Sequence, residues 1–183
     1  MKNENEQFKG TCQYLVMIDF TGLLDYAYEQ RLYDSSYHGL EHWHQVEFNG
    51  LLLASKTGAD ITVVRLFALF HDCRRMDDAY DAEHGPRAVE FIDRCIAEKR
   101  LELDAGRLEK LRTACRLHTR ERQTGDITID TCFDADRLDL GRVGIYPMED
   151  KLATEAGRKI AHKLAQAEVS VFKQREWIRN FRF

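Results

Sequence analysis

Histidine and aspartate side chains, which can bind metal ions, occur in this sequence where the surrounding residues are apolar. The clearest example is the pair His71-Asp72, which follows the apolar run ITVVRLFALF of residues 61–70. On a helix, His71 would share an inward stripe with Val64 and Phe67, because these residues are three, four and seven positions apart. A buried polar group without a partner costs about 1–3 kcal/mol. Both side chains therefore need partners, which either a shared cation or ordinary hydrogen bonds would supply.

Two further segments place a side chain of this kind on an apolar helical face. His42 shares a predicted inward face with Val46, and Asp136 shares one with Cys132. Two imidazoles and two carboxylates suit Mn²⁺, Fe²⁺, Co²⁺ or Ni²⁺, and Mg²⁺ less well. Four protein ligands also leave positions open for water, which a metal can activate near neutral pH. The predicted metal ligands are His42, His71, Asp72 and Asp136.

His84 and His118 have a similar character. His118 continues an apolar stripe that contains Leu111 and Cys115, and His84 lies in the polar segment of residues 77–85. The two histidines could hold a second ion, or they could hydrogen-bond a phosphate group. The sequence therefore allows one or two metal ions.

Neighbouring residues of the same type compete for two of the predicted ligand positions. His38 and His44 are alternatives to His42, and a hydrophobic residue four positions further on favours His42. The alternatives to Asp136 are Asp134 and Asp139. Asp139 could instead support a ligand or form an ion pair.

Helical periodicity and helix-end signals predict the elements that must position these residues. Asp60 and Asp104 are expected to cap the starts of two helices, and Gly58 to end the helix that begins near Leu40. Pro86 fits the first position of another helix. Further helices are predicted within residues 11–33, around residues 132–140, and from Asp150 or Thr154 to about Val171. No strand-like alternation is present, so the predicted fold class is all-α.

Composition and charge exclude several classes of protein. The length of 183 residues fits a single domain spanning the whole chain. No apolar run approaches the roughly 20 residues that a membrane span needs. Residues 1–10 do not resemble a signal peptide, and five scattered cysteines fit a reducing compartment, so we expect a cytoplasmic protein. The net charge of −4 argues against nucleic acid as a partner. The basic residues near the C-terminus are interpreted as a solvated helix end, and the oligomeric state stays open.

Four segments together resemble the HD-domain superfamily of metal-dependent phosphohydrolases: HWHQVEFNG, VRLFALFHD, EHGPRAVE and DADRLDLGRVG. They resemble most a branch of small bacterial HD proteins, over residues 35–146. The resemblance implies a helical bundle, with the predicted N-terminal helices and C-terminal amphipathic helix packed on this motif core. It also implies metal ligation by residues matching His42, His71, Asp72 and Asp136. Superfamily members with two metals carry histidines in the region of His84 and His118.

The resemblance implies a phosphohydrolase that acts on a nucleotide or a related small phosphoester, with metal-activated water attacking phosphorus. Arginines near the motifs would then neutralise the phosphate oxygens, namely Arg74, Arg75 and Arg137. An acid of the polar segment, Glu83, Asp77 or Asp78, would protonate the leaving oxygen. Arg87 and Arg142 are interpreted as surface or helix-end charges. Two alternatives are a binuclear iron oxygenase and a metal-dependent binding module without catalytic activity.

Overall fold

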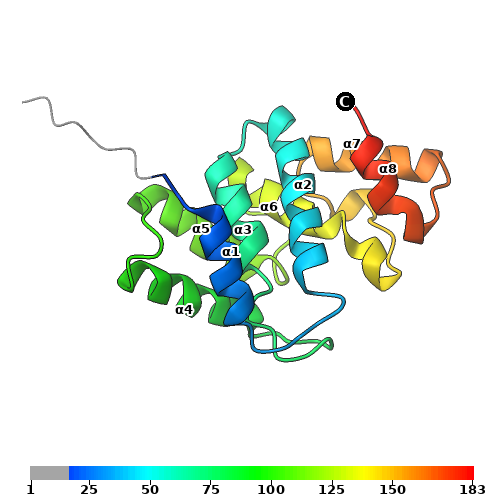
Figure 1. Cartoon of the computed structure of the whole chain (residues 1–183). Helices are drawn as coiled ribbons and strands as arrows, with labels where there is room; N and C mark the ends of the chain where they lie inside the picture. Colours follow the sequence, from blue (N-terminus) through cyan, green and yellow to red (C-terminus); the bar gives the residue numbers. More distant parts are fainter. Residues whose placement is uncertain (1–16) are drawn as a thin grey trace, which may run out of the picture.

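The computed structural model describes residues 17–183, which form eight α-helices and three short 3₁₀ helices without any strand (Figure 1). The prediction of an all-α fold is confirmed. The α-helices are α1 (Phe20–Glu29), α2 (Leu40–Thr57), α3 (Ile61–Phe70), α4 (His84–Ala97), α5 (Ala105–Leu117), α6 (Ile127–Arg137), α7 (Glu155–Gln166) and α8 (Gln174–Asn180). The 3₁₀ helices are η1 (Leu140–Val143), η2 (Glu149–Lys151) and η3 (Val171–Lys173). Within this part of the chain, no helix combines the length and hydrophobicity needed to cross a membrane.

The central helix is α3, which is buried over most of its surface. It packs against α2, α5, α6 and α1, as expected for a helix that is apolar on nearly every face. In Figure 1, α4 and α5 lie on one side of the α2–α3 pair, while α7 and α8 lie on the other. Close approach of α2 and α3 depends on Gly50, where a Cβ atom would come within 2.4 Å of Val64 Cγ1. Phe70, the last residue of α3, is fully buried.

The predicted helix ends are present where a clear capping residue occurs. Asp60 Oδ1 accepts a hydrogen bond from the amide of Thr62 at 2.9 Å and caps α3. Asp104 caps α5 in the same way, through the amide of Arg107. Gly58 ends α2 in the left-handed conformation with a φ of 73°, which glycine adopts without steric cost. These caps set the residues at which α2 ends and α3 and α5 begin.

Other helix boundaries differ from the prediction. The helix α4 begins at His84, so Pro86 is its third residue. Asp126 caps α6, and that helix ends at Arg137 instead of continuing to residue 140. Of the segment 11–33, residues 11–16 lie outside the described residues, and α1 covers residues 20–29.

The final predicted helix is divided in two. The helix α7 starts after the cap Thr154, as predicted, but it ends at Gln166. Glu168 then adopts a left-handed backbone with a φ of 49°, which reverses the chain and places Val171 in η3. A glutamate in this conformation is unusual, and no glycine marks the turn. The sequence pattern therefore did not reveal it.

Candidate metal centre

Three helices bring four ligand-type side chains together in the interior. We call them the first ligand group: His42 from α2, His71 and Asp72 at the end of α3, and Asp136 from α6. The Nε2 atoms of His42 and His71 are 3.0 Å apart. From His42 Nε2, the distance is 3.4 Å to Asp72 Oδ2 and 3.3 Å to Asp136 Oδ1. Metal–ligand bonds of about 2.0–2.2 Å place neighbouring ligand atoms roughly 3–3.5 Å apart, so the spacing fits one ion.

The hydrogen bonds of the two imidazoles leave both Nε2 lone pairs facing each other. His71 Nδ1 lies 3.1 Å from the carbonyl oxygen of Ala68, to which it donates. His42 Nδ1 is 2.7 Å from Asp139 Oδ2 and donates to that carboxylate. Asp136 Oδ1 is buried and has no hydrogen-bond partner among residues 17–183. Two lone pairs and a carboxylate oxygen without a hydrogen-bond partner around one point are what a cation would satisfy. The residues therefore fit a divalent metal.

A second ligand group lies directly beside the first and consists of Asp72, His84 and His118. The Nε2 atoms of the two histidines are 2.9 Å apart, and His84 Nε2 is 3.2 Å from Asp72 Oδ1. His118 Nδ1 donates to the carbonyl of Cys115 at 2.9 Å, and His84 Nδ1 donates to that of Asp81. Asp72 thus directs Oδ2 to the first group and Oδ1 to the second. This arrangement can hold two ions bridged by one carboxylate.

Burial and neighbouring charges set the protonation states of these ligands, and they act differently on each one. Burial lowers the pKa of His71 to about 3, so this imidazole is neutral. Burial raises the pKa of Asp72, but the nearby histidines, His71 first, more than offset this and hold it well below its usual value. Burial and the positive charge of Arg142 also lower the pKa of His42, yet the nearby carboxylates of Asp136, Asp139 and Asp72 raise it to about 9. A proton can therefore occupy this position when a cation does not.

His42 is oriented by an ion pair that reaches to the C-terminal helix. Arg175, on α8, donates from Nε to Asp139 Oδ1 at 2.7 Å and from Nη2 to Asp139 Oδ2 at 2.8 Å. Asp139 is 1% exposed and accepts from His42 Nδ1 as well. Carboxylates in this position fix the orientation of a metal-binding imidazole. The interpretation of the basic C-terminal region as a solvated helix end is therefore wrong for Arg175.

The structure places the predicted arginines in different environments. Arg75 is beside the second ligand group, with Nη1 3.7 Å from Asp72 Oδ1. Arg74 donates to the carbonyl of Gln30 and lies over the ring of Phe91, outside both groups. Arg137 donates to backbone carbonyls, including that of Arg122 at 2.6 Å. Arg74 and Arg137 thus hold loops and helix ends together instead of facing the ligand groups.

Arg142 is a functional candidate that the sequence reading missed. It was interpreted as a surface charge, yet its side chain is only 7% exposed. Its Nη1 is 3.8 Å from Asp136 Oδ1, and its Nη2 is 3.2 Å from His38 Nδ1. The sequence offered one signal for Arg142, which is its position shortly after a predicted ligand and near the end of a helix. Solvated arginines are also common at such positions.

The predicted acids of the polar segment do not join the ligand groups. The side chain of Glu83 is 64% exposed and pairs with Arg120 at 2.6 Å. Asp77 Oδ1 accepts from the amide of Ala79 at 2.8 Å, which closes a local turn. Asp78 accepts a hydrogen bond from Ser35. The structure therefore gives these three acids partners outside the ligand groups.

The structure also shows where the alternative ligand candidates lie. His44 is exposed on α2, away from the first ligand group. His38 is close to it, with Nδ1 2.9 Å from Asp72 Oδ2. Asp134 faces α7 instead, where it accepts hydrogen bonds from the amides of Ala153 and Thr154, each at 2.7 Å.

Replacing Asp134 with alanine should destabilise the fold without affecting metal binding. The change leaves two amides at the start of α7 without their partner, at a cost of roughly 1–3 kcal/mol each. Chemical denaturation measures the loss, and elemental analysis measures metal content. Asp150→Ala is the matched control, because the Asp150 side chain is 68% exposed. Equal stability of the two variants would contradict this role of Asp134.

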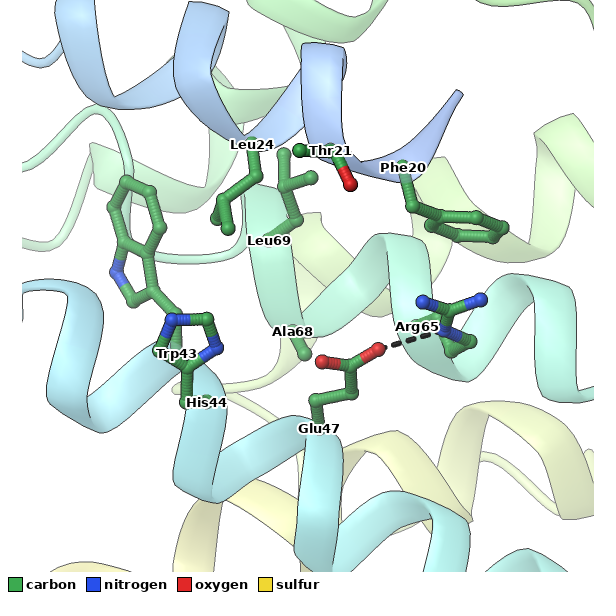
Figure 2. A pocket seen from close by; sticks show the side chains of 9 residues that line it. All are labelled: Phe20, Thr21, Leu24, Trp43, His44, Glu47, Arg65, Ala68 and Leu69. Atoms are coloured by element: carbon green, nitrogen blue, oxygen red, sulfur yellow. Dashed lines mark hydrogen bonds and ion pairs between the residues drawn. The ribbon is translucent and has the colours of Figure 1, made fainter. Parts of the chain in front are cut away.

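A separate cavity of about 200 Å³ lies between α1, α2 and α3 (Figure 2). Two of its charged groups pair with each other: Arg65 Nε is 2.6 Å from Glu47 Oε1, and the Arg65 guanidinium lies 3.7 Å from the centre of the Phe20 ring. Figure 2 shows His44 at its edge, and its lining lacks all members of both ligand groups. This cavity is therefore not part of the candidate metal centre.

Comparison with known proteins gives one informative likeness. The chain is similar to the crystal structure of a predicted HD superfamily hydrolase from an uncultured Thermotogales bacterium. The TM-score is 0.63 at 24% sequence identity, and the match covers 88% of this chain and 91% of the other. No protein-family profile and no curated protein matches the sequence. The fold is that of an HD domain, as the motifs predicted.

Proposed function

We propose that this protein is a metal-dependent phosphohydrolase that acts on a small phosphoester. The observation that supports this most is the carboxylate of Asp72, which lies between two sets of histidine Nε2 atoms, 3.4 Å from His42 and 3.2 Å from His84. The structural neighbour is a predicted hydrolase, which agrees with the proposal. When bound, divalent ions at such a site would activate water and polarise a phosphoryl group.

The charge of the centre supports an anionic substrate. Three carboxylates, those of Asp72, Asp136 and Asp139, face three guanidinium groups, those of Arg75, Arg142 and Arg175. These six charges cancel when the histidines are uncharged, as metal ligation requires. Each divalent ion would leave an excess of positive charge. A phosphate dianion would offset that excess in a site shielded from water.

The chain's own residues would bind and orient the phosphate from two sides. Arg142 lies beside the first ligand group, and Arg75 lies beside the second. Arg75 is held in place by donating to the carbonyls of Asp77 at 3.2 Å and Ala79 at 2.6 Å. Both guanidinium groups are mostly buried, which strengthens their attraction for phosphate oxygens. They replace Arg74 and Arg137 as the proposed phosphate-binding arginines.

Metal removal tests the proposal. Treating the protein with a chelator should abolish the hydrolysis of phosphoesters, and Mn²⁺, Co²⁺ or Ni²⁺ should restore it better than Mg²⁺, because imidazole ligands favour these ions. A screen of nucleotides and alkyl phosphates measures the activity. Hydrolysis that survives complete metal removal would contradict the mechanism. Oxygen consumption by the iron-loaded protein, without hydrolysis, would favour an oxygenase instead.

A further inference from the structure

A pocket of about 260 Å³ lies where α4 meets the end of α1 and the turn after α3 (Figure 1). Its lining consists of three arginines, one glutamate and one phenylalanine, namely Arg74, Arg87, Arg94, Glu90 and Phe91, and includes no member of either ligand group. We propose that this pocket is a binding site for a phosphate group, separate from the metal centre. The site goes beyond the proposed function, because it does not depend on the reaction at the metal centre.

The lining of the pocket carries an excess of positive charge. Its three guanidinium groups and one carboxylate leave a net charge of +2. Asp81, which pairs with Arg87 Nη2 beside the pocket, reduces this excess to +1. A phosphate group carries about −1.5 to −2 charges at neutral pH. The charge of the pocket therefore complements a phosphate group better than a cation or a neutral molecule.

Two of the three guanidinium groups lack a close carboxylate partner. Among residues 17–183, no carboxylate oxygen lies within 4.0 Å of the Arg74 guanidinium, which donates to the backbone carbonyl of Gln30. Arg94 Nε is 3.9 Å from Glu98 Oε1, but Arg100 Nε pairs with the same carboxylate at 2.9 Å. A carbonyl oxygen orients a guanidinium group without neutralising its charge. Both groups thus keep their charge available to an anion.

Shared neighbours hold the three arginines close together. Arg94 Nη2 donates to the side-chain oxygen of Gln30 at 3.3 Å, and Arg74 donates to the carbonyl of the same residue. The guanidinium carbons of Arg94 and Arg74 lie 4.7 and 5.2 Å from the centre of the Phe91 ring. Arg87 Nε donates to the carbonyl of Arg74 at 3.0 Å. Like charges held together repel each other, and an anion between them would remove this cost.

The arginines also keep hydrogen-bond donors for a phosphate group. A guanidinium group carries five N–H donors. Within the described residues, protein partners use one nitrogen of Arg74, one of Arg94 and two of Arg87. Paired N–H groups of arginine match the oxygens of a phosphate. Because the side chains are already positioned, less entropy is lost on binding. The pocket therefore suits a tetrahedral oxyanion better than chloride.

Arg94→Ala tests the site, because this side chain is 42% exposed and its removal should leave the fold intact. Calorimetry of the metal-loaded protein with inorganic phosphate, at constant ionic strength, should reveal a site that this variant weakens about tenfold or more, as expected for the loss of a hydrogen bond to a charged group. The matched control is Arg107→Ala, which removes a 46% exposed arginine from α5, outside the pocket. It should bind phosphate as the native protein does.

Glu90→Gln provides a test of opposite sign, because it removes the negative charge of the lining. Glu90 is exposed, so the variant should fold, and its affinity for phosphate should rise. This variant keeps the inference testable if Arg94→Ala does not fold. Titration with methylphosphonate, which cannot be hydrolysed as a phosphoester, shows whether the free ion or the phosphate group of a larger molecule binds better. The affinity for the preferred ligand should fall in Arg94→Ala.

Phosphate affinity that is the same in the native protein, Arg94→Ala and Glu90→Gln would overturn the inference and would assign all phosphate binding to the metal centre. Equal losses in Arg94→Ala and Arg107→Ala would overturn it as well, because they would reflect only the overall surface charge. A site weakened by Arg94→Ala alone supports the inference whether or not the protein hydrolyses phosphoesters. The proposed function can therefore fail while the phosphate site stands.

Discussion

Replacing Asp72 with alanine should remove most of the bound metal and nearly all activity while the protein stays folded. Both carboxylate oxygens are used, since Oδ2 faces the first ligand group and Oδ1 faces the second. Losing a group that merely supports a ligand typically costs 10–100-fold in metal affinity or activity, so the loss of a shared ligand should exceed about 100-fold. Asp72 lies beyond the end of α3, and the apolar contacts of that helix remain.

Elemental analysis, steady-state kinetics and thermal unfolding measure these three effects separately. The matched control is Asp77→Ala, which removes an exposed carboxylate five positions away that only closes a local turn. Full metal content and turnover in Asp72→Ala would mean that the assignment of both ligand groups has to be abandoned.

Replacing His84 and His118 together with alanine should lower the metal content from two ions per chain to one. The second ligand group would keep a single protein ligand, Asp72 Oδ1, whereas the four members of the first group stay in place. A crystal structure of the metal-loaded native protein should show two ions roughly 3.5–4 Å apart. Hydrolysis should fall strongly, because only one ion would remain to act on the phosphoryl group.

The control for this pair is His162→Ala, since the His162 side chain is 50% exposed on α7 and pairs with Glu149. A native protein that binds one ion, with His84 and His118 contacting an anion, would contradict the two-metal arrangement. It would support the other reading of these histidines, in which they hydrogen-bond phosphate.

Sequence reasoning predicted the members of the first ligand group because each obeys a local rule. His71 and His42 lie on helical faces whose apolar period can be read from a few neighbours, and caps such as Asp60 and Gly58 set the helix ends. The HD-type fold followed from the order of these motifs. Such signals can be read from the sequence because they involve residues within one or two helical turns of each other.

The supporting charges could not be predicted in the same way. Arg175 and Asp139 are 36 positions apart in the chain, and Arg142 reaches His38 across 104 positions. A long, flexible arginine side chain carries no periodic signal that indicates its partner. The sequence favoured Arg74 over Arg142 as a phosphate-binding residue, yet Arg74 binds a backbone carbonyl outside the centre and Arg142 lies beside the first ligand group. Tertiary packing alone decides between these outcomes.

The ion pair of Arg175 with Asp139 has a thermodynamic consequence for the C-terminal helix. Two hydrogen bonds from Arg175 hold the Asp139 carboxylate in the position from which it orients His42, and these bonds require α8 to be docked. Arg179 of the same helix also donates to Gln45 on α2 at 2.8 Å. Coupling free energy is reciprocal, so an ion that binds better to the oriented imidazole must favour the docked helix to the same extent. Metal occupancy and the order of the C-terminal region are thus two readouts of one equilibrium.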